Sequence, residues 1–141
     1  MPRASTAEPQ LSWSQQRRLE FIDFRLQWEG RINRFDLVDF FEISTPQASL
    51  DFAKYLSLAP SNASYDPRQK TYLAARRFTP IWGSPDGFSY LNRLAGCTQG
   101  SLSNDADYLG WAPPTDVARF PARHVDAGIL KRVLAAIRNR R

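Results

Sequence analysis

Cysteine and histidine are almost absent from this sequence: among 141 residues there is one cysteine, Cys97, and one histidine, His124. A single cysteine cannot form a disulfide within the chain, which is typical of a reducing compartment, so we expect a cytoplasmic location. The spacing of zinc ligands and the glycine motifs that bind nucleotides are both missing. The sequence therefore predicts no metal, no cofactor and no enzyme, and a Cys97–His124 pair is the one weak enzymatic alternative.

Long apolar segments are missing too. No run approaches the roughly 18 residues that a membrane-spanning helix needs, and the first ten residues lack the apolar core of a signal peptide. Those first residues are rich in proline, alanine, serine and threonine, so we expect residues 1–11 to form a disordered leader. Apolar residues make up 43% and charged residues 23% of the chain, which are ordinary proportions for a folded globular protein.

The net charge of +5 is unevenly distributed along the chain. The last eleven residues carry five of the 19 basic residues and none of the 14 acids, which leaves residues 1–130 formally neutral. The high isoelectric point therefore describes the C-terminal tail. Nucleic-acid binding is therefore indicated only where particular basic and polar residues are arranged for it.

A first helix is predicted from Ser12 or Ser14, either of which can cap it, to about Glu29, where Gly30 ends it. Its apolar side chains fall into two stripes on opposite sides. One stripe is Leu19, Ile22 and Leu26, and the other is Phe21, Phe24 and Trp28. A helix that is apolar on two sides is covered on two sides. One stripe should face the domain core, and the other should face the C-terminal extension or a second subunit.

Two further helices and a hairpin follow. Asn33 can cap a helix over residues 34–42, and Ser44 can cap another that reaches about Leu58, with Gln47 in capping-box spacing. Residues 62–74 place a turn of Asp, Pro and polar residues between β-favouring residues, which predicts a hairpin. Two helices joined by a short turn and followed by a hairpin are typical of a winged helix-turn-helix.

The chain after the hairpin reads as a helical extension. We expect a short helix from Ser84 to about Leu94, an irregular stretch from Gly96, a helical turn near residues 104–110, and a final helix capped by Asp126. The apolar face of that final helix is Ile129, Leu130, Val133, Leu134 and Ile137. The predicted fold is mainly α with a small β-hairpin (α+β). It comprises a leader (1–11), a winged helix-turn-helix domain (12–82) and an extension for dimerisation and linkage (83–141).

The third predicted helix has one apolar and one polar side. Its inner side holds Ala48, Phe52, Tyr55 and Leu56, and its outer side holds Gln47, Leu50, Lys54 and Ser57. A glutamine can bond the edge of adenine with two hydrogen bonds, and an exposed leucine can meet the methyl group of thymine. Thr45, Ser49 and Lys54 can reach phosphate oxygens. The alternative is an ordinary amphipathic helix with a solvated polar face, and the hairpin that follows favours DNA.

The hairpin and the start of the second helix add basic residues. Arg68 and Lys70 lie near the tip, Arg76 and Arg77 follow, and Asp66 is the one acid among residues 65–77. This excess predicts a wing along a phosphate backbone, and the alternative is a solvated turn. Arg31 and Arg34 flank the N-terminus of the second helix, which can bind a phosphate or can simply be capped by Asn33. Eight DNA contacts are predicted in all: Arg34, Thr45, Gln47, Ser49, Leu50, Lys54, Arg68 and Lys70.

The combined pattern resembles the N-terminal region of WYL-domain transcriptional regulators, in particular the BrxR/CapW-like repressors linked to phage-defence islands. The segments that carry the resemblance are residues 18–23, 26–30, 32–37, 41–44, 47–51, 55, 60–62, 65–66 and 70–72. It covers residues 14–82 well and continues weakly to the C-terminus. It implies a homodimer on a palindromic operator and repression of a neighbouring defence operon. Carried over by position, it makes Gln47, Ser49 and Lys54 recognition-helix contacts, and Arg68 and Lys70 wing contacts.

The chain departs from that family in one respect. It contains no Trp-Tyr-Leu tripeptide, and it ends where a sensor domain would begin. We therefore expect either a piece of a longer regulator or a regulator without a sensor, with an effector acting only through a domain absent from these residues. The candidate dimer contacts are Phe21, Phe24, Trp28, Ile129, Leu130 and Val133. The rival hypothesis is a winged-helix module that binds proteins and does not bind DNA specifically.

Overall fold

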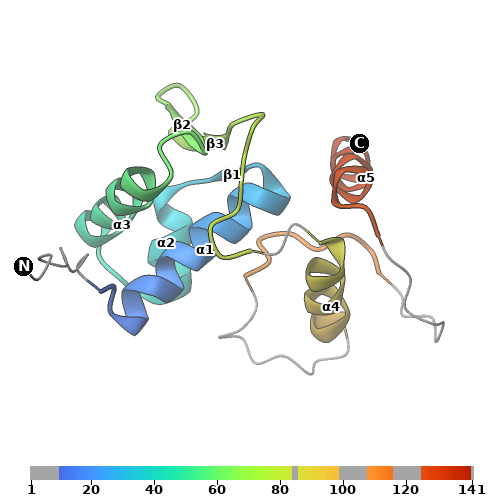
Figure 1. The fold of residues 1–141 in the computed structure, drawn as a ribbon, viewed down its shortest axis with the longest axis horizontal. Helices are drawn as coiled ribbons and strands as arrows, with labels where there is room; N and C mark the ends of the chain where they lie inside the picture. Colours follow the sequence, from blue (N-terminus) through green and yellow to red (C-terminus); the bar gives the residue numbers. More distant parts are fainter. Residues whose placement is uncertain (1–9, 84–85, 99–107, 116–124, 141) are drawn as a thin grey trace, which may run out of the picture.

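The computed structural model describes residues 10–83, 86–98, 108–115 and 125–140 (Figure 1). Helix α1 (Trp13–Glu29) begins at Ser12, whose side chain accepts a hydrogen bond from the backbone N–H of Gln15. It ends at Gly30, which adopts a left-handed conformation with φ of 76°. Glycine adopts that conformation without the clash that a Cβ atom would cause. Both predicted ends of the first helix are confirmed.

Helices α2 (Arg34–Phe41) and α3 (Thr45–Leu58) form the helix-turn-helix. The side chain of Asn33 accepts from the backbone of Asp36 and the Asp36 side chain accepts from the backbone of Asn33, so α2 begins with a complete capping box. Ser44 caps α3 as predicted, but the Gln47 side chain donates to Asp51. The box predicted for α3 is therefore half formed.

A three-stranded antiparallel sheet forms the wing. Strand β2 (Ala63–Asp66) pairs with β3 (Thr71–Ala74) in the predicted hairpin, with Tyr65 opposite Tyr72. Strand β1 (Arg31–Ile32) pairs with the other edge of β3, which gives the order β1-β3-β2. Strand β1 was not predicted, because two residues are too few to show an alternating pattern.

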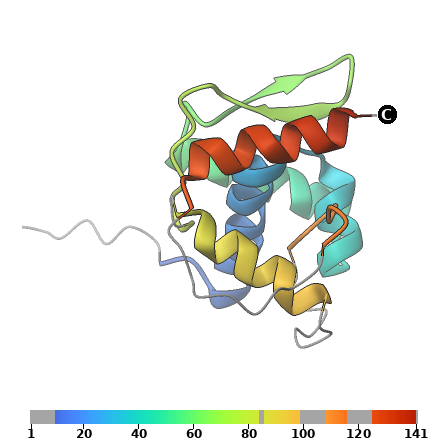
Figure 2. The same cartoon turned by 90° about the vertical axis from the view of Figure 1, so that its right-hand side faces the viewer.

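Helix α1 lies at the centre of the molecule, with α2 and α3 on one side and α4 (Gly87–Thr98) and α5 (Ala127–Asn139) on the other (Figures 1 and 2). Both of its apolar stripes are buried. Phe21 contacts Phe40, Phe41 and Tyr108, with ring centroids 4.7–5.5 Å apart. Trp28 lies 4.9 Å and Phe24 lies 6.2 Å from the ring of Tyr90 in α4.

These contacts correct the expected dimer surface. Phe21, Phe24 and Trp28 are covered by aromatic side chains of the same chain, so they are not available to a second subunit. Of the two neighbours considered for that stripe, the C-terminal extension is the one the structure shows.

The extension is partly as predicted. Helix α5 begins at Asp126, whose carboxylate accepts from the N–H of Ile129, as expected. Helix α4 continues to Thr98, so the irregular stretch predicted from Gly96 begins too early. Tyr108 to Gly110 is not helical, and the earlier part of that predicted turn, like the predicted helix start at Ser84, lies outside the described residues. Within the described residues, no helix is both long and apolar enough to cross a membrane.

Candidate nucleic-acid interface

Helix α3 presents its polar side to the surface, as predicted. Its inner side chains Ala48, Phe52 and Tyr55 are fully buried, while Leu50 on the outer side is 64% exposed. Thr45 and Ser57 are also exposed, and Gln47, Ser49 and Lys54 are half-buried. An apolar side chain as exposed as Leu50 is costly in water and is suited to a contact with another apolar group.

The amide of Gln47 is held in a fixed orientation. Its Nε2 donates to Oδ1 of Asp51 at 3.1 Å. Asp51 is fully buried and also accepts from Nε and Nη2 of Arg18 in α1, at 2.6 and 3.3 Å. A glutamine amide has two N–H donors and one carbonyl oxygen, so one donor and the acceptor remain for a ligand. That donor–acceptor set is what the N6/N7 edge of adenine requires.

Ser49 and Arg34 are joined to each other. The Ser49 hydroxyl donates to the backbone oxygen of Thr45 at 3.2 Å and accepts from Nη1 of Arg34 at 3.1 Å. Arg34 therefore lies against α3, although it belongs to α2. The N-terminus of α2 is occupied by Asp36, which accepts from the N–H of Asn33 at 2.8 Å. Simple capping is thus what the structure shows at this helix end, and Arg34 faces the recognition helix.

The tip of the wing is basic and well ordered by hydrogen bonds. Asp66 accepts from the N–H groups of Arg68 and Gln69, at 2.9 and 3.3 Å, which closes the turn. Arg68 and Lys70 are both exposed, and Lys70 has a positive φ of 51°. Nη2 of Arg31 in β1 donates to Oε1 of Gln69, so a third cation lies beside the tip. The β1–β3 pairing, which the sequence did not show, explains this position.

The wing is packed against the recognition helix through aromatic rings. Tyr72 in β3 stacks on Phe52 in α3, with centroids 4.2 Å apart and planes 4° from parallel. Tyr65 in β2 contacts Tyr72 at 5.0 Å. Helix and wing are therefore held at one relative position, as a surface that contacts a groove and a backbone together would require.

A buried polar cluster that the sequence did not predict holds the inner side of α3 in place. The Tyr55 hydroxyl donates to Asp23 of α1 at 2.7 Å and accepts from Asn62 at 3.1 Å. Asp23 also accepts from the backbone N–H groups of residues 81–83. Burial, together with the bond to Asp23, raises the pKa of Tyr55 far above its usual value. The one visible signal was an aspartate within the most apolar part of α1.

Comparison with known proteins places this geometry in a family. Residues 14–96 match the family model of the BrxR transcriptional regulator winged helix-turn-helix domain. The chain belongs to the BrxR family. The resemblance inferred from the sequence is therefore confirmed, and this is a family of transcriptional regulators, not of enzymes.

Three curated relatives of this BrxR-family chain are each described as a DNA-binding transcriptional repressor CapW. The relative from Stenotrophomonas maltophilia is 44% identical over 136 residues, which are 96% of this chain and 46% of the relative. Those from Escherichia coli and Pseudomonas aeruginosa are 41% and 43% identical over 126 residues, or 89% of this chain and 42% of each relative. The chain thus spans less than half the length of the relatives it matches.

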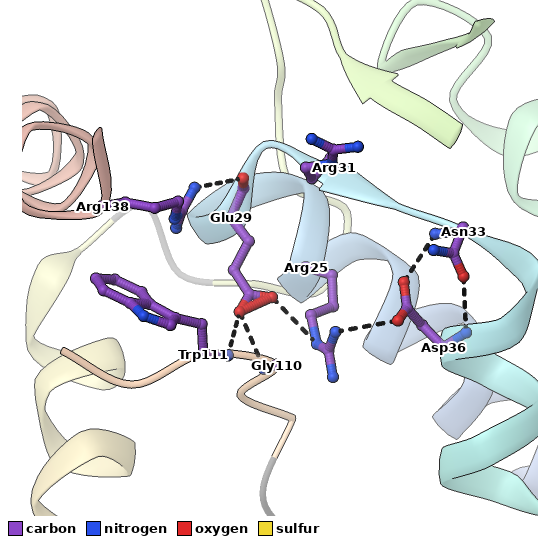
Figure 3. A pocket seen from close by; sticks show the side chains of 8 residues that line it. All are labelled: Arg25, Glu29, Arg31, Asn33, Asp36, Gly110, Trp111 and Arg138. Atoms are coloured by element: carbon purple, nitrogen blue, oxygen red, sulfur yellow. Dashed lines mark hydrogen bonds and ion pairs between the residues drawn. The ribbon is translucent and has the colours of Figure 1, made fainter. Parts of the chain in front are cut away.

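The BrxR-family chain also has an open pocket of about 450 Å³, which lies between the end of α1, strand β1, the start of α2, Gly110, Trp111 and α5. Glu29 Oε1 accepts from the N–H groups of Gly110 and Trp111, and Oε2 pairs with Arg25 at 3.3 Å (Figure 3). Arg138 of α5 donates to the backbone oxygen of Glu29 at 2.9 Å. Burial raises the pKa of Glu29, against the opposing effect of Arg25. These bonds connect the end of α1 to Gly110 and Trp111 and to α5.

The remaining predicted dimer residues lie on α5. Leu130 is half-buried and packs against the core, whereas Ile129 and Val133 are exposed. Ile137, on the same predicted apolar face, is exposed as well. The apolar face predicted for this helix is therefore divided: its Leu130 and Leu134 side contacts the chain's own core, and its isoleucine and valine side is open.

Proposed function

We propose that this chain is the DNA-binding part of a transcriptional repressor, with α3 in the major groove and the wing along the phosphate backbone. The observation that carries the proposal is the outer face of α3. An amide held by Asp51 lies on that face one turn from an exposed leucine, and the basic wing is packed against the same helix. The description of the relatives as DNA-binding transcriptional repressors supports it.

Each predicted contact has a role in the proposal. Gln47 and Leu50 read base edges, because they offer a donor–acceptor pair and an apolar surface. Arg34 binds a phosphate beside α3, and Ser49 acts mainly by holding the Arg34 guanidinium. The other phosphate contacts are Thr45, Lys54, Arg68 and Lys70. Contacts to phosphate fix the helix in register and supply affinity for any sequence.

The resemblance to phage-defence repressors extends the proposal to the whole regulator. Two copies would bind a palindromic operator, with recognition helices about 34 Å apart or a multiple of that distance. The regulator would act in the cytoplasm, and the genes it represses would form a neighbouring defence operon. An effector would act through a sensor domain outside these 141 residues.

The test separates base readout from phosphate contact. Gln47→Ala should lower the preference for the DNA upstream of the gene over a scrambled duplex by about 1–3 kcal/mol, because a bidentate base contact is lost. Replacing both Arg68 and Lys70 with alanine should weaken binding to both duplexes equally and should flatten the salt dependence by about two units of slope. Gln16→Ala on α1, whose amide contacts Glu20 of the same helix, is the matched control.

Unchanged DNA binding by these variants would contradict the proposal. If Gln47→Ala and the wing variant bind both duplexes as the unchanged chain does, α3 does not read DNA. The exposed Leu50 would then belong to a surface for a protein partner, as in the rival hypothesis.

A further inference from the structure

A buried ion pair lies directly behind the amide that α3 presents to the surface. Asp51 is fully buried, and its Oδ2 accepts from Nε of Arg18 at 2.6 Å while its Oδ1 accepts from Nη2 at 3.3 Å. The same Oδ1 accepts from Nε2 of Gln47 at 3.1 Å. Arg18 belongs to α1 and Asp51 to α3, two helices that lie side by side (Figure 1). A contact between helices therefore sets the orientation of the Gln47 amide.

The carboxylate admits only one orientation of that amide. A carboxylate oxygen accepts hydrogen bonds and donates none, so the nitrogen of the Gln47 amide has to face Asp51. Turning the amide over would bring its Oε1 against Oδ1 of Asp51, which places two acceptors together with no proton between them. Asp51 therefore decides which polar atoms of Gln47 are left for a ligand. They are one N–H and the carbonyl oxygen.

These two groups distinguish adenine from guanine. In the major groove adenine presents the acceptor N7 and the donor N6, whereas guanine presents two acceptors, N7 and O6. One N–H and one carbonyl oxygen satisfy adenine with two hydrogen bonds. Guanine requires two donors, and the second N–H of Gln47 is already bonded to Asp51. The carbonyl oxygen of Gln47 would therefore face O6 of guanine, again acceptor against acceptor.

We propose that Asp51, held by Arg18, is a positioning residue that makes Gln47 select adenine and reject guanine. Asp51 is fully buried, so it acts on the base only through the amide of Gln47. The inference rests on the proposed function, because it requires α3 to lie in the major groove. It deepens that function by naming the base that α3 accepts and the base that it rejects.

Replacement of Asp51 with asparagine should turn the Gln47 amide over. The oxygen of the new side chain should stay with Nε of Arg18, which makes the shorter of the two bonds from the guanidinium. The NH2 group of the new side chain then faces Gln47, and a donor at that place requires the carbonyl oxygen of Gln47 to turn inward. Both N–H groups of Gln47 are left for the groove, and they are the two donors that guanine requires.

Binding to a set of duplexes tests this selection. Each base pair of the DNA upstream of the gene is replaced in turn, and the position at which Gln47→Ala loses its preference is the one that Gln47 reads. There the unchanged chain should bind adenine about 5–150-fold more tightly than guanine. In Asp51→Asn this ratio should fall to about one or below. A loss of stability lowers the affinity for both duplexes by the same factor, so it does not change the ratio.

Two controls separate positioning from stability. Phe24→Leu alters a buried ring that contacts Tyr90 on the side of α1 away from α3, so it should lower stability and keep the ratio. In a chain that already carries Gln47→Ala, the further change Asp51→Asn should leave the ratio unaltered, because the amide through which Asp51 acts is gone.

The orientation of the amide can also be measured without DNA and without a change at Asp51. In NMR spectra of the unchanged chain, the Gln47 side-chain amide is assigned by its loss in Gln47→Ala. One of its N–H groups should exchange with water much more slowly than the other, because it is bonded to Asp51. Comparable exchange of both N–H groups would overturn the proposal.

The binding outcomes distinguish this inference from the proposed function. If Gln47→Ala removes a base preference that Asp51→Asn retains, the inference is overturned and the proposed function stands. An equal effect of Asp51→Asn with and without the Gln47 amide would overturn it as well. If Gln47→Ala changes the preference at no position, the proposed function fails and this inference fails with it.

Discussion

Removal of one hydroxyl group from the base of the recognition helix should measurably destabilise the domain. Tyr55→Phe keeps the buried ring but deletes the bond to Asp23 at 2.7 Å and the bond from Asn62 at 3.1 Å. A hydrogen bond between neutral groups contributes about 0.5–1.5 kcal/mol to stability, and one to a charged group contributes about 1.5–3 kcal/mol. Asp23 keeps the three N–H groups of residues 81–83, and Asn62 keeps the backbone oxygen of Thr79, so neither is left without a partner. We therefore expect a loss of about 2 kcal/mol in the free energy of unfolding, within the range for the bond to the Asp23 carboxylate.

Urea denaturation is the appropriate assay. With a slope of about 1–3 kcal/mol per molar for a domain of this size, the midpoint should fall by about 1 M and the slope should stay unchanged. Tyr65→Phe is the control, since Tyr65 is 41% exposed and the loss of its hydroxyl should change stability by less than about 0.5 kcal/mol. If the two variants shift the midpoint equally, the buried cluster does not stabilise α3 as argued.

Two further predictions concern buried carboxylates. Asp51→Asn keeps the shape of the side chain but leaves Arg18 without its counter-charge, so urea denaturation should show a loss of about 2–3 kcal/mol, and unchanged stability would contradict the pairing. Because burial raises the pKa of Glu29, its proton binds the folded chain more tightly, and this carboxyl contributes stability that is complete below its ordinary pKa of 4.5 and lost as the pH rises through the folded value. The free energy of unfolding of the unchanged chain should therefore rise relative to that of Glu29→Gln as the pH falls toward 4.5. A difference in free energy that does not change with pH would refute the shift.

The sequence predicted the elements whose ends are encoded locally. Ser12, Asn33 and Ser44 cap their helices through bonds to residues three positions away, and Asp66 closes the hairpin turn through bonds to residues two and three positions away. Such bonds need no knowledge of the rest of the chain. Gly30 ends α1 for an equally local reason.

The parts that were missed depend on residues far apart in the sequence. Asp51 meets Arg18 across 33 positions, and Asp23 meets the N–H groups of residues 81–83 across about 60. Strand β1 forms only because β3 lies beside it. The second stripe of α1 was correctly expected to be covered, but its spacing did not distinguish Tyr90 and Tyr108 of the same chain from a partner subunit. A periodic pattern shows that a face is buried and does not show which element covers it.

Whether α3 and the wing read DNA is decided by a titration of this chain with labelled DNA from upstream of its gene, beside a scrambled duplex of equal length, at several salt concentrations. We expect clear preference for the upstream DNA, with binding to both duplexes falling steeply as salt increases, because the wing and Arg34 replace counterions on phosphates. Equal, weak binding to both duplexes that disappears when the last eleven residues are removed would contradict it, since the interaction would then belong to the basic tail.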